Sequence, residues 1–168
     1  MTTTLIAETE RRFEADASAA QQAPEVRATL TNGRARLSAG PFNWEADLPA
    51  ALGGGNLAPS PTAYLLGALA GCAVAFLHDT LAPQLGVTID DLSAVVSCRT
   101  DARGLLGMAG AAPDLADIEL TVTIASGAGD EELARLQDAW LQRCPIFLAL
   151  AKPNDVATTF RRGAPSAS

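Results

Sequence analysis

One long stretch without charged side chains limits what this chain can fold into. It runs from Ala63 to Leu77 and follows Ser60-Pro61, a pair suited to the N-cap and first position of a helix. The stretch is shorter than the roughly 20 apolar residues that a membrane-spanning helix needs. We therefore expect a helix buried inside a globular protein, running to about Ala82, where Pro83 would stop it.

The composition agrees with one globular domain. The chain has 168 residues, of which 48% are apolar and 18% charged, so it can bury a core without disulfides or a structural metal. Its net charge of -7 and its only lysine, Lys152, argue against a nucleic-acid partner, because phosphate binding needs clustered positive charge. Met1 to Arg12 shows no signal-peptide pattern. We expect a cytoplasmic protein with no membrane partner.

Strand patterns precede the predicted helix. Apolar and polar residues alternate from Val26 to Thr31, and Asn32-Gly33 is a favoured hairpin turn. The return strand carries Arg34 and Arg36 on one face, and a third strand runs from Phe42 to Leu48. These segments predict an antiparallel meander of three strands.

The second half of the sequence predicts both strands and helices. Two strands are expected at residues 92–100 and 117–125, joined by a loose loop, and a second long helix starts near Asp130. Pro145 interrupts or restarts that helix. A closing strand is suggested by an alternating segment that contains Val156, Thr158 and Phe160.

This order predicts an α+β fold, because it lacks the regular βα alternation of a doubly wound sheet. We divide the chain into an N-terminal arm (1–22), helical or mobile, a folded domain (23–162) and a disordered tail (163–168).

Two of the three cysteines lie on the predicted long helices. Cys72 belongs to the apolar stripe of the first helix, and Cys144 ends the second, so packing the helices together would bring the thiols into contact. If Pro145 begins a new helical segment, Cys144 caps it, where a thiolate is stabilised. A free cysteine also serves simply as a small hydrophobic side chain, and the residues alone leave both interpretations open.

Two landmarks in the sequence resemble a known family. The segment GGGNLAPSPTAYLLGALAGC, residues 53–72, resembles the signature of the OsmC/Ohr family, the organic hydroperoxide resistance proteins, and Cys144-Pro145-Ile146 matches its second landmark. Their order and spacing agree over residues 25–160. The resemblance implies an intertwined homodimer, with antiparallel sheets wrapped around two central helices and the active sites at the subunit interface.

The resemblance also implies roles for particular residues. Cys72 would be the peroxidatic cysteine and Cys144 the resolving one, and an arginine of the first hairpin would stabilise the thiolate. Either Arg34 or Arg36 matches that arginine, and we favour Arg34 because it follows the turn; the alternative is a solvated surface arginine. The sequence departs from the family at Thr62-Ala63, where peroxidases of the family carry a glutamate that pairs with this arginine.

The third cysteine and the single histidine are expected to have structural roles. Cys98 is expected in the core, on one strand face with Ala94 and Val96, and His78 is expected to be a polar residue at a helix end. The cysteines and His78 show none of the short spacings of zinc sites, and no nucleotide-binding motif is present, so we expect no metal or cofactor. Gly53-Gly54-Gly55 is interpreted as a flexible loop.

We expect an enzyme that reduces organic hydroperoxides in oxidative stress defence, through a redox-active disulfide between Cys72 and Cys144 that an external dithiol reduces. The alternative is a non-catalytic homodimer of the same fold that binds a small apolar ligand at its interface. The missing glutamate favours the alternative.

Overall fold

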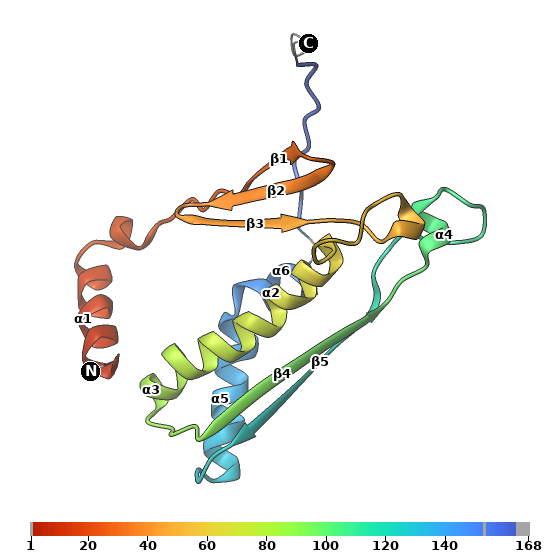
Figure 1. Cartoon of the computed structure of the whole chain (residues 1–168). Coiled ribbons are helices and arrows are strands. Elements are labelled where there is room, and N and C mark those ends of the chain that lie inside the picture. Colours follow the sequence, from red (N-terminus) through yellow and green to blue (C-terminus); the bar gives the residue numbers. More distant parts are fainter. Residues whose placement is uncertain (1, 153, 164–168) are drawn as a thin grey trace.

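The computed structural model describes residues 2–152 and 154–163, and it has the predicted α+β fold (Figure 1). A three-stranded antiparallel sheet has the order β1-β2-β3, and a separate two-stranded antiparallel ribbon joins β4 to β5. In chain order the elements are α1 (Thr2–Ala15), η1 (Ala17–Ala20), β1 (Arg27–Thr31), β2 (Arg34–Ala39), β3 (Phe42–Ala46), η2 (Ala50–Leu52), α2 (Pro61–Phe76), η3 (Leu77–Leu81), α3 (Ala82–Leu85), β4 (Asp91–Arg99), α4 (Ala102–Leu105), β5 (Ala116–Ala125), α5 (Asp130–Arg143) and α6 (Pro145–Ala151).

The β1–β3 meander forms as its turn chemistry predicts. Asn32 and Gly33 both have positive φ, 52° and 77°, the conformation that a two-residue type I′ hairpin turn needs. The register places Arg36 opposite Glu45, so the charged residues of β2 and β3 share one face of the sheet. This sheet lies across the start of α2 (Figure 1).

The central helix is longer than the sequence predicts. Ser60 caps it by accepting the Ala63 N–H at 3.2 Å, but Pro83 does not stop it. A π-helical turn, η3, lies directly before α3, the segment that contains Pro83. At its end the Ala82 N–H donates to the carbonyl of Leu77, five residues earlier. This wider turn lets the helix continue past proline, which has no N–H and would clash with a regular preceding turn. The helix ends at Gly86, with a φ of 71°.

This central helix is buried on one side only. Its 25 residues, Pro61–Leu85, are long and apolar enough in length and composition to cross a membrane, yet one side packs on the remainder of the chain through Leu69, Ala73, Leu77 and Leu81. On the other side, Gly67, Gly71 and Ala75 are exposed. The predicted burial of this helix is therefore confirmed for one side, whereas no described element covers the second side.

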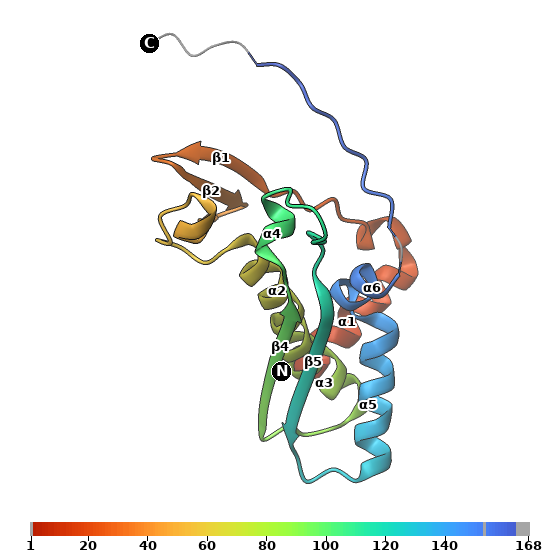
Figure 2. The same cartoon turned by 90° about the vertical axis from the view of Figure 1, so that its right-hand side faces the viewer.

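The core lies between α2, α5 and the inner face of the β4–β5 ribbon. Leu136 and Trp140 of α5 meet the buried side of the central helix, and alternate residues of both strands cover them. The long ribbon runs beside α2 and α5 flanks it, as Figures 1 and 2 show from two sides.

Two local predictions are corrected, and the N-terminal arm is helical. The loop between β4 and β5 contains the short helix α4. Val156 and Phe160 lie in an extended segment that forms no ladder within the described chain, and their side chains are 82% and 96% exposed. A strand forms only beside a partner strand, which this segment lacks here. The expected disordered tail, residues 163–168, lies outside the described residues except for Gly163.

Replacing Leu136 by alanine is expected to destabilise the fold by about 2–5 kcal/mol, because the fully buried side chain would leave a cavity beside α2. The matched control is Leu105→Ala, at a side chain that is 59% exposed, with an expected change within about 0.5 kcal/mol. Urea unfolding followed by circular dichroism measures both. Equal losses in the two variants would contradict this description of the core.

Candidate active site

The two landmark cysteines are in direct contact. Cys72 lies in the middle of α2, Cys144 follows α5, and their Sγ atoms are 2.9 Å apart. Both thiols are free. Cys144 is fully buried, whereas Cys72 is partly exposed. Only Cys72 can therefore meet a molecule from solvent without a rearrangement of the core.

Cys144 stands at a junction between two helices. Its backbone leaves the helical conformation (φ -69°, ψ 113°), its N–H still bonds the Trp140 carbonyl of α5, and Pro145 occupies the first position of α6. The Cys144 Sγ accepts the Phe147 N–H at 3.5 Å, which is the N-cap arrangement predicted from the sequence. Pro145 thus ends α5 and begins α6, and the Cys144 thiol lies at the junction between the two helices.

The surroundings of Cys72 disfavour its thiolate within one chain. Burial, together with the hydrogen bond and the charge of Cys144, raises the pKa of the Cys72 thiol to about 11. The Ile146 backbone N–H acts in the opposite sense and lowers this pKa. At neutral pH the thiol is protonated in this setting, so a reactive thiolate needs an added positive charge beside it.

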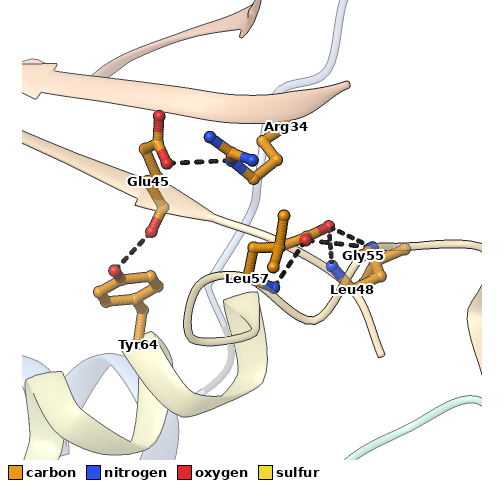
Figure 3. A network of polar contacts seen from close by, with 7 residues as sticks. Arg34, Glu45, Leu48, Gly55, Leu57 and Tyr64 are labelled. Atoms are coloured by element: carbon orange, nitrogen blue, oxygen red, sulfur yellow. Dashed lines mark hydrogen bonds and ion pairs between the residues drawn. The ribbon is translucent and has the colours of Figure 1, made fainter. Parts of the chain in front are cut away.

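The two hairpin arginines differ in their surroundings. Arg34 is partly buried, and its Nε donates to Glu45 Oε2 at 2.9 Å (Figure 3), whereas the Arg36 side chain is exposed. Arg34 contacts neither thiol within the part of the chain that the structure describes; its polar partner is Glu45. The structure therefore brings together Cys72 and Cys144, and leaves Arg34 in a separate polar cluster at the start of α2.

That polar cluster is organised by Asp47, which is not among the residues predicted for the site. Its buried carboxylate accepts backbone N–H groups from Leu48 at 2.8 Å, Gly55 at 3.1 Å and Leu57 at 3.0 Å (Figure 3). The Leu57 N–H contributes most to holding the pKa of Asp47 below its usual range, Gly55, Leu48 and the charge of Arg34 act in the same sense, and burial opposes them.

The glycine-rich segment before α2 is a loop, as predicted, and it folds around this carboxylate. Gly53 has a φ of 88°, which favours glycine, and a Cβ on Gly54 would overlap the Leu48 carbonyl. The signal that could have found the site is the alternation of Glu45 and Asp47 on the face that also carries Arg34.

The other reactive residues lie apart from both clusters. Cys98 lies on the same face of β4 as Ala94 and Val96, as predicted, but it is only half-buried and does not belong to the core cluster, so the prediction of a core residue is not confirmed. His78 is exposed, and its Nδ1 lies 2.7 Å from Asp79 Oδ1. Within residues 2–152 and 154–163, no three histidine, cysteine or acidic side chains gather closely enough to hold a metal ion.

The family follows from a family model that matches more than half of the chain. A family model described as OsmC-like protein matches residues 53–159, which include the loop, both cysteines and most of the core. The chain belongs to the OsmC-like family. A comparison of its sequence with curated proteins gave no significant match.

Solved structures share the fold of this OsmC-like protein. An OsmC-like protein from Mycoplasma pneumoniae is 23% identical, with a TM-score of 0.65 over 78% of this chain and 89% of that one. An organic hydroperoxide resistance protein from Elizabethkingia anophelis is 20% identical, with a TM-score of 0.56 over 77% and 88%. The organic hydroperoxide resistance protein OsmC from Legionella pneumophila is 18% identical, with a TM-score of 0.51 over 77% and 89%.

Replacing Asp47 by asparagine is expected to lower stability at pH 7 and to lower it less at pH 3. A carboxylate with a depressed pKa stabilises the fold above its unfolded pKa, about 3.9, and this contribution is lost as pH falls through the folded value. Urea midpoints of both proteins at the two pH values measure the effect. A difference between the proteins that does not change with pH would show that the charge of Asp47 plays no part.

Proposed function

We propose that this OsmC-like protein is a thiol-dependent peroxidase that reduces organic hydroperoxides. The Cys72 thiolate attacks one peroxide oxygen, an S–O bond forms as the O–O bond breaks, and the alcohol leaves after taking up a proton. Cys144 then attacks the Cys72 sulfenic acid, water leaves, and a disulfide forms. An external dithiol reduces the disulfide by two electrons and restores both thiols.

The observation that carries the proposal is the contact between the two thiols. At 2.9 Å, the Cys144 sulfur reaches a Cys72 sulfenic acid without movement of either helix. Their exposures support the order of events, because Cys72 is open to a substrate and Cys144 is sealed in the core. A nearby resolving thiol also protects the sulfenic acid from further oxidation.

The absence of a positive charge beside Cys72 within the described chain is compatible with a homodimer in which the partner supplies it. Cys72 needs a cation, and Arg34 lies at the other cluster of its own chain, so the proposal assigns the arginine of one chain to the thiol pair of the other. The exposed side of α2, with Gly67, Gly71 and Ala75, is a surface on which a second central helix can approach closely. In this proposal the protein works in the cytoplasm in defence against oxidative stress.

The proposal is tested by counting free thiols before and after one equivalent of cumene hydroperoxide, with peptide mapping. The expected result is rapid loss of two thiols and a Cys72–Cys144 disulfide, while Cys98 stays reduced. Cys72→Ser should abolish turnover, and Cys144→Ser should stop after one turnover with Cys72 oxidised. Cys98→Ser is the matched control, with turnover unchanged. Persistence of all three thiols for hours would refute the peroxidase.

A second candidate is the non-catalytic homodimer that binds a small apolar ligand. It is favoured by a cavity of about 410 Å³ between β5 and α5, lined mainly by aliphatic side chains and by Trp140. The chain has two tryptophans, so Trp44→Phe leaves Trp140 as the only reporter. Saturable quenching of Trp140 by a small apolar molecule, together with inert thiols, would favour this candidate over the peroxidase.

A further inference from the structure

Arg34 has a carboxylate partner even though the family glutamate is missing. The resemblance to the family places that glutamate at Thr62-Ala63, and neither of these side chains carries a charge that could form an ion pair with a guanidinium. In this structure Glu45 of β3 pairs with Arg34 instead, with Nε to Oε2 at 2.9 Å. The charge that the sequence lacks after Pro61 is thus present on a neighbouring strand.

The pairing is selective between the two hairpin arginines. Arg36 lies directly opposite Glu45 in the ladder, yet Glu45 bonds the diagonal neighbour, Arg34, on the same face. Arg34 also experiences the negative charge of Asp47, which the backbone N–H groups of the loop keep ionised. Glu45 therefore holds Arg34 by direct contact, and the charge of Asp47 adds a weaker attraction through space.

Glu45 is itself tied to the helix that carries Cys72. The Tyr64 hydroxyl of α2 donates to the Glu45 carbonyl at 2.5 Å (Figure 3), and the Asp47 N–H donates to the Pro59 carbonyl at 3.2 Å. Both bonds use groups on the side of β3 away from β2. The strand that holds the carboxylate is thus anchored at two points to the entrance of α2, and Arg34, Glu45 and Tyr64 form one connected chain of contacts.

We propose that Glu45 is the positioning residue for Arg34 and does in this protein what the family glutamate does elsewhere. Glu45 orients the guanidinium through its carboxylate, and Tyr64 keeps the strand of Glu45 in register with α2. The inference rests on the proposed peroxidase function, in which Arg34 serves the thiolate. The side chains of the pair are 24% and 41% exposed, so its effect belongs to activity more than to stability.

The test compares kcat/KM for cumene hydroperoxide in the full-length protein and its variants. Glu45→Gln keeps the shape and removes the charge, and a loss of about tenfold to a hundredfold is expected, because positioning errors on the order of 1 Å have that effect. Glu119→Gln, at an exposed carboxylate of β5, is the matched control and should leave kcat/KM unchanged. Thermal unfolding of each variant checks that the fold is intact.

Two further variants separate positioning from a general structural effect. If Glu45 acts through Arg34, then Glu45→Gln causes no added loss once Arg34→Ala is present. A carboxylate restored at the family position, Thr62→Glu in the Glu45→Gln protein, should recover much of the rate. An active wild type with an unaffected Glu45→Gln variant, or additive losses with Arg34→Ala, overturns the inference alone. An inactive wild type overturns the proposed function and the inference together.

Discussion

The packing of the central helix, with its π-turn η3, against α5 and the β4–β5 ribbon is the contact on which the rest of the structure depends. Leu69, Ala73 and Leu77 of the central helix belong to one buried cluster with Leu136 and Trp140, and the β4–β5 ribbon packs against this cluster. Ala73 is completely buried in this cluster. Cys144 belongs to the same cluster and Cys72 packs against it, so their distance is set by hydrophobic packing and not by a mobile loop.

The chemistry is divided between two regions joined by one rigid element. The thiol pair lies in the apolar core, where burial suppresses ionisation, and the Arg34 cluster lies in a polar setting at the start of α2. Tyr64 belongs to the polar end of the helix and Cys72 to its apolar middle, so both are carried by the same continuous helix. Glu45 and Tyr64 thus connect Arg34 to one end of the helix that carries Cys72.

Local patterns in the sequence predicted the elements well, since each depends on neighbouring residues. The Asn32-Gly33 turn, the strand alternation and the N-cap at Cys144 all follow from short-range rules, and the family landmarks pointed to the cysteine pair. The continuation of the helix past Pro83 was not predictable, because the compensating π-turn leaves no distinct residue pattern.

The contacts of the Arg34 cluster could not be predicted from the sequence for a different reason. Which carboxylate pairs with Arg34 depends on a diagonal choice across two strands, and the role of Asp47 depends on a loop that folds back eight to ten residues later. The extended segment around Val156 shows a case in which the sequence pattern is present but the predicted strand does not form. Its alternation is a true strand pattern, but a pattern cannot supply the neighbouring strand that a ladder requires.

The glycine-rich loop has a consequence for how this sequence can vary. Gly53 needs a left-handed backbone, Gly54 faces the Leu48 carbonyl, and Gly55 lies against the Asp47 carboxylate, so each excludes larger side chains for its own reason. A change at one of these positions cannot be offset by a change at another. Random substitution should find this short loop among the least tolerant segments of the molecule, although it lies at the surface, where most sequences drift freely.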